Sequence, residues 1–257
     1  MFLKILMIFC LLSFSSVYSD DLDISTLVDA GNKEIKTVIE TFALGGDYKA
    51  VHYATPEGLI IGLDVGLEVT AIKVSDDFKN ALSAMGNVTD DIPAYIPLPR
   101  LNITKGLPFG FDIGLSLLKV KVQGMEILNY GGSLKYAILD GSGMLPAVAV
   151  RGTYNKGEYF DKIKTSTFGI EALVSKSFLL IEPFGGIGYQ KGKGEINIDD
   201  FLPAELPAST GDIDYEPSVS QVRLFAGATL KLAFFHLAVQ ADFGKVKTFS
   251  TKLGLNF

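Results

Sequence analysis

The sequence has no tryptophan, two histidines and a single cysteine among its 257 residues. Beyond the first twenty positions it also has no run of about 18 apolar residues, the length that a membrane-spanning helix requires. Helical membrane spans are therefore excluded for the rest of the chain. The 23 Lys and Arg residues are outnumbered by 29 Asp and Glu residues, which gives a net charge of −6. Because nucleic-acid binding needs a basic face, we expect no nucleic-acid partner.

The first residues have the pattern of a secretory signal peptide. Lys4 supplies a positive charge, residues 5–14 are apolar, and Val17 and Ser19 occupy the two positions that signal peptidase inspects. We expect cleavage after Ser19, so residues 1–19 form a removed signal. Since Cys10 is the only cysteine and lies inside it, the exported chain is predicted to have neither a disulfide nor thiol chemistry.

One helix is predicted, from Ile24 to Phe42, and Gly45 and Gly46 end it. Its apolar residues recur at helical spacing and share one stripe. We assign residues 20–56 to this helix and to a periplasmic or plug segment. The stripe, our plug candidate, consists of Ile24, Leu27, Val28, Ile35, Val38, Ile39 and Phe42.

After this helix the apolar period changes from 3.6 to two and stays there to the end of the chain. From Leu63 to Ala71, for example, every second residue is apolar, and the intervening positions hold Asp64, Gly66 and Glu68. Ten such stretches, each near the length of about 9–11 residues that a tilted strand needs to cross a bilayer, follow one another. Two fold classes fit: a soluble β-sandwich, or a transmembrane antiparallel β-barrel of 8–12 strands over residues 57–257.

Connection lengths favour the barrel. The gaps after the first, fifth and seventh stretches are long (75–96, 155–164 and 194–217), whereas those after the second, sixth and eighth are very short. Outer-membrane barrels alternate long outer loops with short periplasmic turns in this way. The fold class predicted is therefore all-β: a transmembrane barrel of about ten strands with a short N-terminal helix.

The chain ends in KTFSTKLGLNF, with apolar residues at alternating steps and an aromatic residue in last place. This ending resembles the C-terminal signal of bacterial outer-membrane barrels, and its residues here are Phe249, Leu253, Leu255 and Phe257. The resemblance implies a bacterial outer-membrane location after export. It also implies two partners, membrane lipid and the outer-membrane barrel assembly machinery.

Two further stretches, AGNKEIKTVIETF at 30–42 and PRLNITKGLPFGFDIG at 99–114, resemble a family of bacterial outer-membrane barrels without an assigned activity. In that family a short N-terminal helix precedes the first strand. A more distant likeness to the fatty-acid-transporter barrels rests on the N-terminal segment, but the Asn-Pro-Ala signature of those proteins is missing here.

If the polar face of the strands points inward, the barrel lumen carries charges of both signs in equal number. One interpretation is an internal salt-bridge network that holds a narrow barrel, and the other is a polar conduit. The predicted lumen residues are Asp64, Glu68, Arg100, Asp112, Lys135, Arg151, Glu171, Glu182, Arg223, Lys231, His236, Asp242 and Lys252.

Glycines are frequent on the same face and leave missing side-chain volume in the lumen. They either ease strand curvature or make room for a plug, formed by the 24–42 helix or by residues 47–56. These glycines are Gly62, Gly66, Gly110, Gly114, Gly131, Gly169, Gly186, Gly188, Gly227 and Gly254.

The sequence repeats one pattern, GLDVGLEV at 62–69 and GFDIGLSL at 110–117. Neither copy precedes a helix, so a phosphate loop is excluded. We interpret them as the first and third strands. With Arg100 on the strand between them, Asp64, Arg100 and Asp112 are predicted to form an acid–base–acid ladder.

We expect no enzymatic activity, no cofactor and no metal. Some small barrels are hydrolases, but these place His near the outer rim, whereas His52 and His236 fall near the periplasmic end. The acidic stretch at 194–217 lacks the spacing of a calcium loop. Two functions stay open: passive transport of a small or hydrophobic solute through a narrow or plugged channel, or a structural, surface-interaction barrel that acts through its outer loops. The oligomeric state is left open.

Overall fold

A computed structural model describes residues 32–58, 62–84, 92–122, 125–160, 163–196 and 216–257. Ten antiparallel strands close into one barrel, because β1 pairs with both β2 and β10 and every other strand pairs with its chain neighbours. This confirms the predicted fold class. The strands are β1 Leu63–Lys73, β2 Tyr95–Gly106, β3 Phe111–Val122, β4 Met125–Asp140, β5 Ala147–Tyr159, β6 Ile163–Ser175, β7 Ile181–Ile196, β8 Ser218–Leu232, β9 Phe235–Phe243 and β10 Thr248–Asn256.

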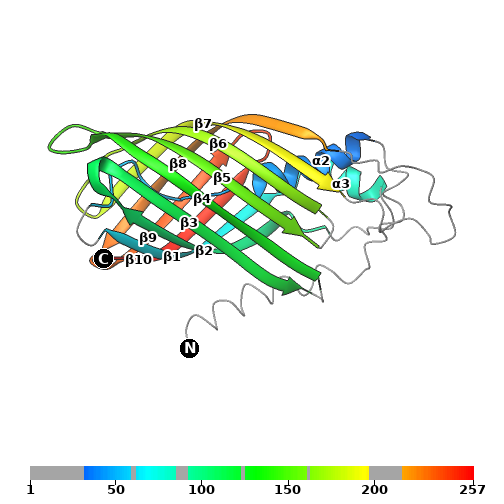
Figure 1. Cartoon of the computed structure of the whole chain (residues 1–257), viewed down its shortest axis with the longest axis horizontal. Coiled ribbons are helices and arrows are strands. Elements are labelled where there is room, and N and C mark those ends of the chain that lie inside the picture. The colour runs from blue at the N-terminus through cyan, green and yellow to red at the C-terminus, as the bar shows by residue number, and fades with distance from the viewer. Residues whose placement is uncertain (1–31, 59–61, 85–91, 123–124, 161–162, 197–215) are drawn as a thin grey trace.

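Two helices lie together at one end of the barrel, away from the C-terminus (Figure 1). They are α2, Asn32–Gly45, and α3, Asp76–Ala84. We call this end, where β1, β3, β5, β7 and β9 finish, the helix-side mouth. The opposite end, where β10 finishes, is the C-terminal mouth. None of the helices in the described part of the chain is long and apolar enough to cross a membrane.

The structure corrects three local predictions. The helix continues to Gly45 instead of ending at Phe42, and residues 24–31 lie outside the described residues. The connection after the fifth strand is short, because β5 reaches Tyr159 and β6 begins at Ile163. The long gap at 75–96 contains α3, whose start is capped by the Ser75 hydroxyl, which accepts a hydrogen bond from the Phe78 amide at 3.1 Å.

The outer face of the barrel is apolar over most of its height. Tyrosines mark its limit towards the helix-side mouth, at Tyr130, Tyr154 and Tyr189, and beyond them the outward positions turn charged, as at Lys156 and Lys191. Aromatic residues such as Tyr136, Phe178, Phe234, Phe235 and Phe257 are exposed towards the other mouth. An apolar belt between aromatic girdles is the surface of a membrane barrel. The strands extend past this belt at the helix-side mouth.

Candidate functional site: the lumen and the chain that crosses it

The chain passes through the barrel before it enters the wall. Helix α2 occupies the helix-side mouth, and β1 begins at the C-terminal mouth. Residues 46–57, which we call the lumen segment, join the two. Residues 46–54 are all buried, including the charged side chains of Asp47 and Lys49. The lumen is therefore occupied by the protein's own chain.

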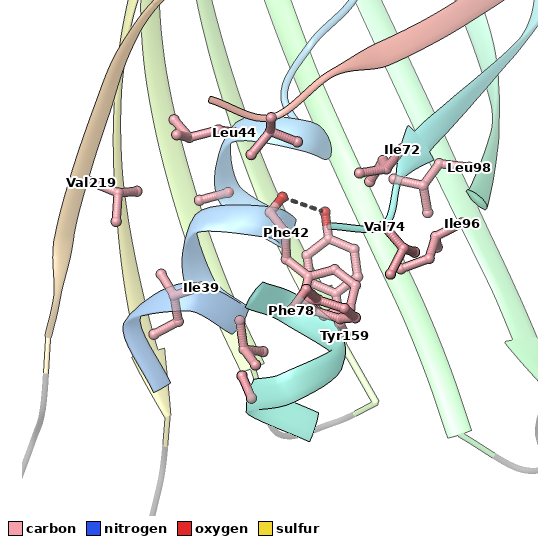
Figure 2. Packing of buried hydrophobic residues seen from close by; sticks show 14 of the residues in the cluster. Ile39, Phe42, Leu44, Ile72, Val74, Phe78, Ile96, Leu98, Tyr159 and Val219 are labelled. Atoms are coloured by element: carbon pink, nitrogen blue, oxygen red, sulfur yellow. Dashed lines mark hydrogen bonds between the residues drawn. The ribbon is translucent and has the colours of Figure 1, made fainter. Parts of the chain in front are cut away.

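An apolar layer surrounds α2 at the helix-side mouth (Figure 2). Phe42 stacks on Tyr159 of β5 with ring centroids 4.7 Å apart and meets Phe78 of α3 edge-on at 6.0 Å. Ile35, Val38, Ile39 and Phe42, the plug candidates within the described residues, are all buried in this layer. The other three candidates, Ile24, Leu27 and Val28, lie outside the described residues.

Wall side chains form hydrogen bonds with the backbone carbonyl groups at the start of the lumen segment. Arg100 of β2 donates from its two terminal nitrogens to the carbonyl oxygens of Asp47 and Gly46, both at 2.7 Å. Asn129 and Asn155 donate to the same Gly46 carbonyl at 2.9 and 3.1 Å. One carbonyl thus accepts hydrogen bonds from three strands.

A second set of contacts holds the other end of the lumen segment near the C-terminal mouth. Lys135 of β4 donates to the carbonyl oxygens of Tyr53 and Thr55 at 3.1 and 2.8 Å. The Ala54 amide donates to the Ser175 hydroxyl at 3.1 Å. These bonds supply the backbone partners that an extended segment cannot find within itself.

Glu57 ends the lumen segment among polar neighbours. Its amide donates to Asp112 at 3.2 Å, and its carboxylate accepts from Asn256 at 2.5 Å and pairs with His52. Burial disfavours the ionised carboxylate, but His52 and Lys135 outweigh burial and hold the pKa of Glu57 well below its usual value. Glu57 is therefore charged at neutral pH.

The predicted lumen charges are all inward, and they form separate groups. Glu171 pairs with Arg151 at 2.5 Å and also with Arg223, which in turn pairs with Asp242. The remaining pairs are Lys135 with Asp112 at 2.7 Å, Lys231 with Glu182 at 2.5 Å, His236 with Asp64 at 3.1 Å, Lys252 with Asp64, and Arg100 with Glu68 at 3.6 Å. All these side chains are buried except that of Lys231, which is 33% exposed.

The predicted ladder of Asp64, Arg100 and Asp112 does not form. In the register of β1 and β2, Arg100 lies opposite Glu68, and Asp64 lies opposite Thr104. The two aspartates are neutralised by Lys252 and Lys135 instead. The spacing along one strand could not reveal this, because the stagger between strands decides which residues are level.

The glycine prediction needs correction at two positions. Gly62 and Gly110 have φ angles of +27° and +78° and lie in the turns that precede β1 and β3. Most other predicted glycines face long side chains of the wall, such as Lys252 against Gly66 and His236 against Gly254. Of the predicted set, Gly114 faces the lumen segment, at Tyr48.

The C-terminal residues are on the outer face of β10. Phe249, Leu253 and Phe257 are 44–49% exposed, and Leu255 is half-buried. The position is compatible with recognition from outside the barrel.

Several buried residues of the lumen were not named individually as site residues from the sequence. They are Asp47, Tyr48, Lys49, Glu57, Asn129, Asn155 and Gln190. Residues 47–56 were predicted as one of two possible plugs, but they have no apolar period that would indicate which of their side chains meet the wall. The asparagines and Gln190 do lie on the predicted inward face, where a buried amide side chain implies a hydrogen-bond partner.

A family model described as a family of unknown function, DUF6588, matches residues 65–257. The chain belongs to this family. The match begins within β1 and includes the rest of the barrel wall. No curated protein matches the sequence.

Three solved structures are similar to this DUF6588 chain. The N-terminal β-barrel domain of Pseudomonas aeruginosa OprF is 12% identical over 76% of this chain and 97% of that one, with a TM-score of 0.30. Yersinia pestis Ail, in complex with the heparin analogue sucrose octasulfate, is 12% identical over 75% and 93%, with a TM-score of 0.29. The translocator domain of the Neisseria meningitidis autotransporter NalP is 8% identical over 93% and 100%, with a TM-score of 0.33. All three are outer-membrane β-barrels.

Proposed function

We propose that the protein is a bacterial outer-membrane channel closed by its own N-terminal segment, which passes a small polar solute when that segment is displaced. The observation that carries this proposal is the lumen segment, buried through the barrel and bonded by wall side chains at both ends. The apolar belt and its aromatic girdles support membrane insertion. The strands extend beyond the apolar belt at the helix-side mouth, and this favours that mouth as the one on the outer side of the membrane.

The chemistry of the wall favours a polar solute over a hydrophobic one. Arg100, Asn129, Lys135 and Asn155 all present donors that the backbone of the lumen segment now uses. If the segment leaves, water or a solute with oxygen acceptors can take its place on the same donors. A hydrophobic solute would leave these buried groups without partners.

The resting state is closed, because opening would expose apolar surface as well as polar groups. Ile39, Phe42 and Leu44 of α2 are at most 5% exposed. Transfer of three such side chains to water costs about 5–9 kcal/mol in total, from roughly 1.5–3 kcal/mol each. Spontaneous opening is therefore rare, and displacement needs a trigger or a partner.

The test is deletion of residues 20–55, measured as single-channel conductance in a planar bilayer. We expect brief, rare openings in the full protein and a steady conductance in the deletion variant. Heat-dependent gel mobility would check that the deleted variant still forms a barrel. A folded deletion variant with the same low conductance as the full protein would refute the plug.

A second candidate is a barrel without flux that binds a partner at the helix-side mouth. The observation that favours it is α3, which is packed on α2 in the connection between β1 and β2. The connections concerned are 75–96 and 194–217, of which residues 85–91 and 197–215 lie outside the described residues. A closed, folded deletion variant would direct attention to these connections.

A further inference from the structure

Both histidines of the chain come together at the C-terminal mouth, although 184 positions separate His52 from His236. His52 belongs to the lumen segment and pairs with Glu57. His236, at the start of β9, lies with its Nε2 3.1 Å from Oδ2 of Asp64 in β1. His52, Glu57 and Asp64 each offer one ligand atom, and these atoms lie within 4.8 Å of one another.

The facing atoms of this cluster are short of hydrogen-bond partners. Among the described residues, His52 Nε2, Asp64 Oδ2 and His236 Nε2 are buried and have no hydrogen bond of good geometry. Each imidazole nitrogen faces a carboxylate, His52 that of Glu57 and His236 that of Asp64, but neither contact has the geometry of a hydrogen bond. A cation bound between the two pairs would satisfy these buried atoms.

The remaining polar atoms of the same side chains are held in place by neighbours. His52 Nδ1 is 3.3 Å from the Tyr53 carbonyl oxygen, and Glu57 Oε2 accepts from Asn256 at 2.5 Å. Asp64 Oδ1 accepts from Lys252. Metal ligands are commonly oriented by this kind of outer contact, with imidazole donating its other N–H to a carbonyl.

We propose that His52, Glu57, Asp64 and His236 bind Zn²⁺, and that the ion joins the lumen segment to the barrel wall. Imidazole and carboxylate are ligands that Zn²⁺ takes at about 2.0–2.2 Å, usually four in a tetrahedron. The edge of such a tetrahedron is about 3.3 Å by that geometry. The 3.1 Å between His236 and Asp64 is close to it, and the ligand atoms of His52, Glu57 and Asp64, which lie within 4.8 Å of one another, need a closure of up to about 1.5 Å.

The ion has a route to the cluster. A pocket of about 240 Å³ at the C-terminal mouth is lined by His236 and Glu57 themselves, together with Tyr53, Lys231, Phe235 and Asn256. Two ligands come from the lumen segment and two from the wall, so release of the ion would weaken their attachment. Bound zinc would therefore stabilise the closed state.

The experiment is titration of the whole exported protein in detergent with ZnCl₂, followed by calorimetry. The protein is purified on a tag without histidine and treated with a chelator first. We expect one Zn²⁺ to bind per chain. Its affinity should be at least about 10-fold weaker in His52→Ala, and binding at this site should be lost in His52→Ala/His236→Ala. Phe235→Leu, which changes the same pocket without removing a ligand, should bind as the unaltered protein does.

Co²⁺ provides a second measurement on the unaltered protein, in case an alanine variant fails to fold. A tetrahedral Co²⁺ absorption band that Zn²⁺ abolishes supports the site. No binding below about 100 µM Zn²⁺, which corresponds to about −5.5 kcal/mol, would overturn it, as would equal binding by the histidine-free double variant. Because these readouts need no flux, they succeed or fail independently of the proposed channel function.

Discussion

Arg100 is the wall residue whose replacement should open the channel most directly. Its guanidinium donates to two carbonyl oxygens of the lumen segment, at 2.7 Å each, and lies 3.6 Å from Glu68. Arg100→Lys keeps a positive charge for Glu68, but a single ammonium cannot reproduce the planar fork that reaches both carbonyls. The substitution therefore weakens the hydrogen bonding to the lumen segment without leaving Glu68 unpaired.

The expected size follows from the bonds lost. A hydrogen bond to a charged group contributes about 1.5–3 kcal/mol, and Arg100→Lys removes one of two. Since about 1.4 kcal/mol is a factor of ten in an equilibrium, the open population should rise about 10- to 150-fold. Single-channel recordings at fixed voltage measure this as the fraction of time open.

The matched control is Arg151→Lys, which makes the same chemical change in the wall. Arg151 donates to Glu171 on the neighbouring strand, at 2.8 Å from its Nε, so this bond is not broken when the lumen segment moves. Because the pair is present in both the closed and the open state, the open fraction should change less than about threefold, which corresponds to less than about 0.7 kcal/mol. Equal opening by both variants would refute the argument that Arg100 holds the segment.

Three further predictions address closure, stability and acid response. A Cβ built on Gly192 would lie 2.9 Å from that of Ala43, so Ala43→Cys with Gly192→Cys should form a disulfide after a small shift. Oxidation should then abolish channel openings, and reduction should restore them. Openings under oxidation, with the disulfide verified by mass spectrometry, would count against a moving α2. Glu171→Gln leaves Arg151 without a carboxylate and Arg223 with Asp242 alone. It should lower the free energy of unfolding by about 3–5 kcal/mol in urea, against about 0.5 kcal/mol or less for the exposed Glu158→Gln. Similar losses in the two variants would show that the buried network is not structural. The folded pKa of Glu57 lies well below its usual value of 4.5, so its contribution to closure is complete above pH 4.5 and declines as the pH falls further. Acid should therefore raise the open fraction, and Glu57→Gln should flatten this rise. An unchanged acid response in the variant would show that Glu57 does not cause it.

The sequence predicted the wall of this protein better than its contents. A strict period of two determines which side chains share a face, and ten such stretches, together with the alternation of connection lengths, the signal-peptide pattern and the C-terminal strand, predicted the closed barrel. Helix α3 was missed although Ser75, Asp76 and Asp77 form a recognisable helix start. A capping signal inside an expected loop therefore carried information that connection length alone did not.

Contacts between strands and with the lumen segment could not be predicted in the same way. Which carboxylate Arg100 meets depends on the stagger of β1 against β2, and no single strand encodes that stagger. The lumen segment has neither helical nor strand periodicity, because its backbone is bonded by side chains from the surrounding wall rather than by a regular partner. His52 and His236 illustrate the result, since only the closed barrel brings them to one place.

The inward glycines show which sequence signal distinguishes an occupied lumen from a merely narrow one. Many of them, such as Gly66 and Gly254, make room for long side chains from the adjacent strand, and a barrel without a plug would need them as well. Gly192 and Gly194 are different, because side chains there would overlap Ala43 and Ile39 of α2. They lie in the part of β7 that extends towards the helix-side mouth, past the apolar belt, where strand curvature within the membrane places no demand on them. A glycine on the inward face beyond the belt therefore indicates that something else enters the barrel there, and in this protein it is α2.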